Sequence, residues 1–300
     1  MTPSNTGDRI PDSSCDIKSE TNPGLIAKAH CNRYDILILG ITIVIGGQYF
    51  SWNAGLVAGF GSYFIATVLI GSAYFCLCLS VSELSSALPF AGGAYGLARC
   101  TLGFYAGFMV GCCESAEYIC YVALSAVSLG SIIITIIPFL TLYQPLIWLL
   151  FYASALSVYI FGGKIFWRIN IGLGIASVVI ILVFCFGSLH WVNTERYATS
   201  IDGKWFIGGF TSFLRVIPIS TWFFVGVESL NMACDDVVEP KKSIPWAQTR
   251  CIALLNVTAI FVLIVCSSLP GDIISLASDL TPLNSGWCNI LLDCSQLVPC

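Results

Sequence analysis

Charged residues are scarce in this sequence: Asp, Glu, Lys and Arg together make up 10% of its 300 residues. Soluble domains carry about 25% of them, so this chain cannot cover a globular surface that faces water. Thirteen Lys and Arg against seventeen Asp and Glu give a net charge of −4, which excludes a nucleic-acid-binding protein that relies on a basic patch. Hydrophobic residues make up 57% of the chain and the mean hydropathy is +0.85, so the sequence describes a membrane protein.

Histidine is nearly absent, and this argues against metal and enzyme chemistry. The two histidines, His30 and His190, stand alone, and neither a Ser/His/Asp set nor an HExxH motif is present. We therefore expect no metal, no cofactor and no enzymatic activity. Most of the fifteen cysteines lie in apolar runs, where Cys behaves as a small hydrophobe. The exceptions are Cys288, Cys294 and Cys300, which fall in the last polar segment and could pair outside the cell.

No secretory signal peptide is visible at the start of the chain. Residues 1–34 are polar and contain no apolar stretch before a small-residue cleavage site. Their composition is typical of a disordered tail.

Seven apolar segments are long enough, or nearly long enough, to cross a bilayer, which takes about 20 residues. The third is too long for a perpendicular helix, so we expect it to tilt or to continue beyond the bilayer. Together they give an all-α polytopic membrane protein with its transmembrane region at 35–269. The expected spans are Ile36–Phe50, Gly59–Leu79, Gly103–Ile137, Tyr143–Phe161, Ile169–Leu189, Phe210–Met232 and Cys251–Leu269.

Basic residues predict the orientation of these spans, because Lys and Arg gather in cytoplasmic loops. If the N-terminus is cytoplasmic, ten of the thirteen basic residues lie inside the cell and three outside. We therefore expect a multi-pass protein of the plasma membrane with a cytoplasmic N-terminus. Residues 270–300 would then lie outside, where an eighth span could begin at Leu291–Cys300.

Three acidic residues lie inside apolar segments, where a carboxylate costs roughly 2.5–3.5 kcal/mol at the bilayer centre. Glu114 and Glu117 are three residues apart and share a helical face, while Glu228 follows Gly226 in the sixth segment. Two ionised carboxylates on one face repel, so the pair suits a shared proton or a cationic amine. The alternatives are that Glu114 and Glu117 make only interhelical hydrogen bonds and that Glu228 satisfies unwound backbone.

Glycines interrupt the first and sixth segments. Gly46 and Gly47 precede Gln48 in the first, and Gly226 lies in the sixth. A broken helix offers N–H groups to an anion and carbonyl groups to a cation, although close packing through small residues is an alternative. Paired interruptions are typical of transporter binding sites. These patterns give the candidate substrate-binding residues Gly46, Gly47, Gln48, Glu114, Glu117 and Gly226.

Three motifs in order resemble those of the amino acid–polyamine–organocation (APC) permeases. They are SELSSALPFAGGAYGLAR at Ser82–Arg99, which resembles the cytoplasmic loop after the second span, WFFVGVES at Trp222–Ser229 and DDVVEPKKSIP at Asp235–Pro245. Two further segments, Ile45–Asn53 and Glu114–Tyr118, look most like the ethanolamine-permease branch.

The resemblance implies a LeuT-type fold, in which ten of twelve spans form two inverted five-helix repeats. Residues 33–270 would form the first repeat and two helices of the second, so the chain is expected to be truncated at its C-terminus. By analogy, the Gly46 and Gly47 amides hold a substrate carboxylate, and the carbonyls of Trp222 and Val225 take its amine. Trp222 is also implied as the gating aromatic residue. A lysine that some relatives carry in the fifth span has no counterpart in Ile169–Leu189.

The function expected from this resemblance is secondary active transport of a small amine, such as ethanolamine, or of an amino acid. Glu228 matches an acid linked to proton coupling in some members, so H⁺ is the expected coupling ion. The alternative is a truncated permease fragment that does not transport unless a partner supplies the missing helices.

Overall fold

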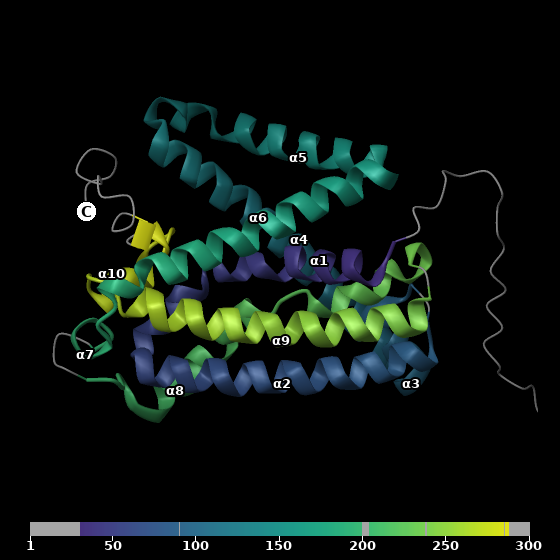
Figure 1. Ribbon diagram of the computed structural model, residues 1–300, viewed down its shortest axis with the longest axis horizontal. Helices are drawn as coiled ribbons and strands as arrows, with labels where there is room; N and C mark the ends of the chain where they lie inside the picture. The colour runs from purple at the N-terminus through teal and green to yellow at the C-terminus, as the bar shows by residue number, and fades with distance from the viewer. Residues whose placement is uncertain (1–30, 90, 200–203, 238, 285, 288–300) are drawn as a thin grey trace, which may run out of the picture.

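The computed structural model describes residues 31–89, 91–199, 204–237, 239–284 and 286–287. Within these ranges the secondary structure is helical, apart from an isolated bridge between Cys31 and Val237 (Figure 1). Six helices are long and apolar enough to cross a membrane, and one bent pair adds a seventh candidate. The predicted all-α polytopic fold is confirmed. The expected tail at 1–34 lies outside the described residues up to residue 30, as do Cys288, Cys294, Cys300 and Leu291–Cys300.

The first span changes helix type at its glycines. α1 (Arg33–Val44) begins where the Asn32 N–H donates to the Asp35 carboxylate at 2.8 Å. It continues as the 3-10 helix η1 (Ile45–Gln48), and a bend of 44° leads into η2 (Trp52–Ala58). The α-helix therefore ends six residues before the expected end of this span, at Phe50.

Two long apolar helices follow, with a short amphipathic helix between them. They are α2 (Phe60–Ala87), α3 (Gly93–Leu102) and α4 (Phe104–Ile136). The bounds of α4 agree within one residue with the expected span, because the helix is apolar up to both of its ends. The segment that resembles a loop motif instead forms the end of α2 and most of α3, which packs along α4. Its apolar residues recur at helical spacing, and a reading by hydropathy does not detect this.

α5 stands away from the rest of the bundle, and α6 leads from it back to α1 and α9. After η3 (Pro138–Tyr143) come α5 (Gln144–Phe161), α6 (Gly163–Ser188), η4 (Leu189–Trp191) and the short α7 (Thr194–Tyr197). Figure 1 shows α5 at the edge of the molecule, and none of its residues, all of which the structure describes, is buried. Its surface is apolar, which suits contact with lipid or with another helix.

The sixth span is broken like the first. α8 (Gly209–Ser220) passes into η5 (Thr221–Phe223) and η6 (Val227–Asp236), with Gly226 between them. α9 (Pro240–Ser267) follows and begins eleven residues before the expected span. The short α10 (Ile273–Ser278) lies in the segment expected outside the cell and packs on η2, where the Asn53 amide donates to the Leu276 and Asp279 carbonyls at 2.7 Å.

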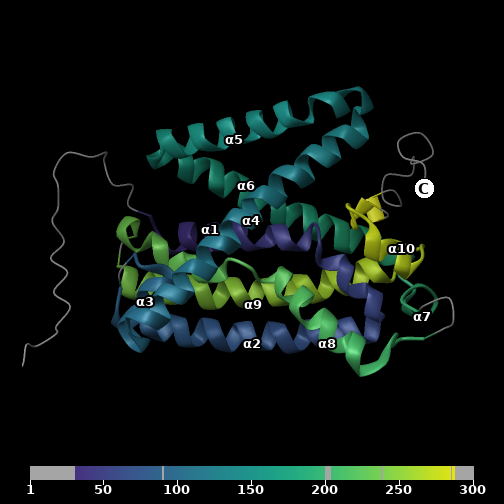
Figure 2. The ribbon, with the colours of Figure 1, turned by 180° about the vertical axis from the view of Figure 1, so that it is seen from behind.

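α9 is the central helix of the fold. It contacts α1, α2 and α6, and Figures 1 and 2 show it between α1 and α2 from both sides. Half of its most apolar window is buried, compared with 11% for α4. This packing holds the two broken spans against each other.

Candidate functional site

The two helix breaks meet in the middle of the bundle. η1 packs on η5, and the backbone at Gly47 lies against the carbonyl group of Trp222. A Cβ at position 47 would collide with that carbonyl oxygen and would stand 3.5 Å from the Cα of Phe223. Only glycine allows the two backbones to come this close. The structure therefore brings Gly47 and Trp222 together, although 175 positions separate them in the sequence.

Tyr121 of α4 packs against both breaks, next to Gly46 and Trp222. A Cβ at Gly46 would lie 2.7 Å from the Tyr121 hydroxyl, which donates to the Ile43 carbonyl at 3.1 Å. Ile43 belongs to the last turn of α1, just before the change of helix type at Ile45. The Tyr121 and Trp222 rings are 5.8 Å apart, so one aromatic pair spans α4 and the sixth span.

Trp222 is tethered to the first span. Its indole N–H donates to the Phe50 carbonyl at 2.9 Å, just beyond η1. Its neighbour Phe223 is fully buried and stacks on Trp52 with 5.4 Å between the ring centroids. The indole thus links the backbone of one break to the other.

Gly226 breaks the sixth span with a left-handed backbone conformation. Its φ of +92° lies in the left-handed region, which favours glycine, and the chain leaves it as the 3-10 helix η6. The Ser229 hydroxyl donates to the Gly226 carbonyl at 2.7 Å and so satisfies part of the unwound backbone. Val225 lies beside this turn and is half-buried.

Two of the three membrane-depth acids share one tyrosine hydroxyl. The Tyr118 oxygen lies 3.2 Å from Glu114 Oε1 and 3.4 Å from Glu228 Oε1, and therefore connects α4 with η6. Glu114 is 9% exposed and also accepts from the Tyr95 backbone N–H at 3.3 Å. A hydroxyl has one proton to donate. Both contacts become hydrogen bonds together only when one carboxyl is protonated and donates to the tyrosine oxygen.

Glu117 and Gln48 have different surroundings from the rest of the predicted site. Glu117 is exposed, so Tyr118 and not Glu117 is the partner that the structure gives Glu114. Gln48 is fully buried but points to α9, where its amide donates to the Leu255 carbonyl at 3.1 Å and the Thr258 hydroxyl at 3.0 Å. The Gln48 Oε1 atom has no hydrogen-bond partner among the described residues.

A cavity of about 780 Å³ lies beside Glu114. It is formed mainly by α4, and its lining includes Tyr95, Glu114, Tyr118 and Met232. The lining is apolar apart from a few groups, and the buried carboxyl lies at its wall. Within the described ranges, no group of three His, Cys, Asp or Glu residues is placed to hold a metal ion.

Tyr118 and Tyr121 are the site residues that the sequence reading missed. Together with Glu114 they follow the spacing i, i+4, i+7 and so lie along one face of α4. That spacing was available from the sequence. What it could not supply was the identity of the facing residues, which come from the two breaks.

The apolar spans, the two facing breaks and the acids beside them define an integral membrane protein with the architecture of a permease. The family model described as "Amino acid permease" matches residues 36–290, and the chain belongs to this family. The resemblance to APC permeases is thereby confirmed.

Three curated proteins are among the relatives of this chain, and the chain spans about half the length of each. An uncharacterised transporter of Rhizobium meliloti (strain 1021) is 25% identical over 262 residues, 82% of this chain and 54% of its own. The methylthioribose transporter of Bacillus subtilis (strain 168) is 25% identical over 261 residues, 79% of this chain and 54% of its own. The lysine-specific permease of Lactococcus lactis subsp. cremoris (strain MG1363) is 26% identical over 273 residues, with 85% and 53% covered.

Proposed function

We propose that this chain carries the substrate site of a secondary active transporter for a small amine or an amino acid, coupled to protons. The observation that supports it most is the contact between the Gly46–Gly47 segment and the Trp222 carbonyl, where two broken spans meet at membrane depth. Broken helices at corresponding positions are the usual site of substrate binding in inverted-repeat transporters. Family membership and the names of the relatives agree with transport.

The backbone groups of the two breaks suit the two ends of an amino acid. In this proposal the amides of Gly46 and Gly47 bind a carboxylate, and the carbonyls of Trp222 and Val225 accept from the amine. In the described conformation the Trp222 carbonyl lies against Gly47, and the Tyr121 hydroxyl lies against Gly46. Substrate therefore enters only when the breaks separate, and the Trp222–Phe50 hydrogen bond acts as the gate that must open.

The linked acids would carry the coupled proton. Tyr118 lies between Glu114 and Glu228, so a proton gained by one carboxyl changes hydrogen bonding on both α4 and the sixth span. This would connect protonation to the position of the break at Gly226. Glu117, which is exposed on α4, is then available to attract a cationic amine.

The test is uptake into proteoliposomes with an imposed proton gradient. The substrates are labelled ethanolamine, lysine and a neutral amino acid, and the variants are Glu228→Gln and Glu117→Gln. We expect saturable uptake of at least one substrate that the gradient stimulates, with stimulation lost in Glu228→Gln. If Glu117→Gln abolishes amine uptake but spares the neutral amino acid, Glu117 recognises charge. Uptake that does not saturate, or that ignores the gradient, would contradict the proposal.

The second candidate is that transport needs helices beyond those of this chain. The observation that favours it is the exposure of α4 and α5: the structure describes every residue of both, and 4 of the 33 in α4 and none in α5 are buried. The relatives are also longer, and the alignments with this chain cover only 53–54% of each. A chimera that adds the C-terminal half of the lysine-specific permease separates the two candidates. Transport by the chimera but not by the chain alone supports this second candidate, and transport by the chain alone excludes it.

A further inference from the structure

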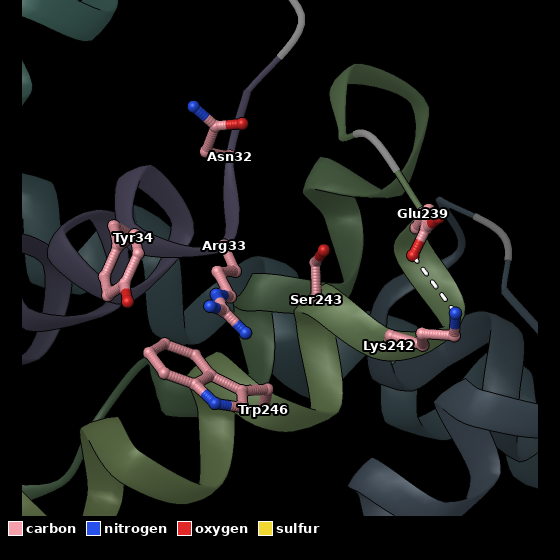
Figure 3. A pocket seen from close by; sticks show the side chains of 7 residues that line it. All are labelled: Asn32, Arg33, Tyr34, Glu239, Lys242, Ser243 and Trp246. Atoms are coloured by element: carbon pink, nitrogen blue, oxygen red, sulfur yellow. Dashed lines mark ion pairs between the residues drawn. The ribbon is translucent and has the colours of Figure 1, made fainter.

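A second concave site lies where α1 and α9 begin, far from the helix breaks. It has a volume of about 480 Å³ and is shown in Figure 3. Two aromatic rings, two cations, one carboxylate and two small polar side chains form it. The lining residues are Asn32, Arg33, Tyr34, Glu239, Lys242, Ser243 and Trp246.

The two aromatic residues hold an arginine between them. The Tyr34 and Trp246 rings meet edge to face with centroids 5.3 Å apart. The Arg33 guanidinium carbon is 5.2 Å from the Tyr34 ring and 5.1 Å from the Trp246 ring, and Figure 3 shows it directed between them. The aromatic faces orient the guanidinium and leave its N–H groups available, because cation–π contact does not use them as hydrogen-bond donors.

A second guanidinium uses the same indole ring. The Arg250 guanidinium carbon is 4.2 Å from the Trp246 centroid, one helical turn along α9. Two like charges that share one ring repel each other, and an anion bound beside Arg33 would lower that repulsion. The geometry therefore favours an anionic ligand at this place.

The described acids near the site do not pair with Arg33. Glu239 is the carboxylate in the lining, and it pairs with Lys242 at 3.3 Å, with side chains 66% and 82% exposed. Exposed pairs of this kind contribute little and exchange readily. Asp35 accepts from the Asn32 backbone N–H. Among the described residues, no carboxylate lies within 4.0 Å of the Arg33 guanidinium.

The site also lies at the end of the bundle where basic and aromatic residues indicate a membrane surface. α1 and α9 are apolar helices whose first turns lie at the same end of the bundle as α3 and the start of α6 (Figures 1 and 2). Seven described basic residues lie at this end, and three lie toward the other: Arg33, Arg99, Lys164, Arg168, Lys241, Lys242 and Arg250, against Arg196, Lys204 and Arg215. Lys and Arg mark the cytoplasmic side, and Trp and Tyr mark the headgroup level.

We propose that this pocket binds the phosphate of an anionic phospholipid headgroup of the cytoplasmic leaflet. Arg33 and Lys242 contact the phosphate, and Tyr34 and Trp246 pack against the glycerol and the first methylene groups. Basic pockets between spans on the cytoplasmic side are suited to anionic headgroups, and an indole with a polar edge is suited to the interface. The proposal does not depend on which substrate the helix breaks carry.

Binding is measured by native mass spectrometry on the full chain, purified in detergent and titrated with phosphatidylglycerol or phosphatidylcholine. We expect one phosphatidylglycerol to be retained at concentrations where phosphatidylcholine is lost. Arg33→Gln and Lys242→Gln should each weaken this binding about fivefold, the equivalent of about 1 kcal/mol per basic residue at an anionic surface. The matched controls are Arg168→Gln and Lys164→Gln, exposed basic residues at the same end but outside the pocket, which should change it less than twofold.

Three results would overturn the proposal. Equal retention of the two lipids would show that the pocket does not recognise the anionic headgroup. Equal weakening by the control variants would assign the effect to the general charge of this end of the protein. Displacement of the lipid by millimolar inorganic phosphate would identify a site for soluble phosphate and not for lipid. Both Lys242 and the control side chains are exposed, so thermal unfolding of these variants should match that of the unchanged chain.

Discussion

The contact between the two helix breaks makes a sharp prediction about glycine 47. Gly47→Ala places a methyl group on the Trp222 carbonyl oxygen, and this neighbour is backbone that cannot turn aside. The breaks must separate by roughly 1.5 Å before the methyl group reaches a normal van der Waals distance. Overpacking costs about 1–3 kcal/mol, and a rigid neighbour favours the upper end. A loss of about 3 kcal/mol corresponds to a Tm lower by roughly 6–12 °C on the scale of soluble domains.

Position 46 supplies an internal comparison. Gly46→Ala meets the Tyr121 hydroxyl at 2.7 Å, while the next ring atom is 3.9 Å away. The hydroxyl is the far end of a side chain, so we expect a cost of about 1 kcal/mol. In a Tyr121→Phe background the clash disappears, and Gly46→Ala should then cost close to nothing. The double-mutant cycle should therefore show a coupling of about 1 kcal/mol between these positions.

The assay is thermal unfolding in detergent, followed by intrinsic tryptophan fluorescence and by the fraction that stays monodisperse after heating. Gly172→Ala is the matched control, because a Cβ there meets no atom within 4 Å. The expected order of Tm loss is Gly47→Ala, then Gly46→Ala, then Gly172→Ala. If Gly47→Ala is as stable as Gly172→Ala, the two broken spans do not pack as described, and the proposed substrate site between them is wrong.

Three other changes test different parts of the molecule. Tyr118→Phe removes the hydroxyl that links two carboxyls, so proton-stimulated uptake should fall at least tenfold with Tm changed by only a few degrees; unchanged stimulation would separate Glu228 from this link. Gln48→Leu removes two buried hydrogen bonds, which destabilises the fold, and an oxygen without a partner, which stabilises it. Because the gain cancels only part of the loss, the free energy of unfolding should fall by about 1 kcal/mol, measured by thermal unfolding. Gly71→Ala collides with the Asn256 amide oxygen and should lower Tm by several degrees, and Asn256→Ala in the same chain should restore most of it; no restoration would place the strain elsewhere.

Hydropathy predicted the α-helical spans well where a helix is apolar along its whole length. α4 runs within one residue of the predicted bounds for this reason. α9 begins at Pro240 and not at Cys251, because hydropathy detects the part of a helix in lipid and not the helix itself. Its first turns are polar in composition, yet they bury Ser243 and Ile244 against neighbouring helices. A pattern of burial spaced by three and four residues, not hydrophobicity, defines that extension.

The sequence predicted which residues break the two spans, but not which residues these breaks contact. The glycine pair at 46 and 47 pointed to a change of helix type, and η1 is found there. The left-handed turn at Gly226 follows from the same logic. That the Trp222 carbonyl is the atom facing Gly47, and that Gln48 turns toward α9, depends on how distant spans pack. One sequence contains no direct record of such pairings.

The central position of α9 has a consequence for how the protein is made. The ribosome reaches Ser267 roughly 10–35 s after Ala87, at about 5–20 residues per second. During that interval α1 and α2 are in the membrane without the helix that packs between them, and the Gln48 amide lacks the α9 groups to which it donates. A polar amide without partners is costly in lipid. We therefore expect the insertion machinery to keep the Gln48 side chain away from lipid until α9 is made. A photocrosslinker at position 48 should capture that machinery until α9 emerges.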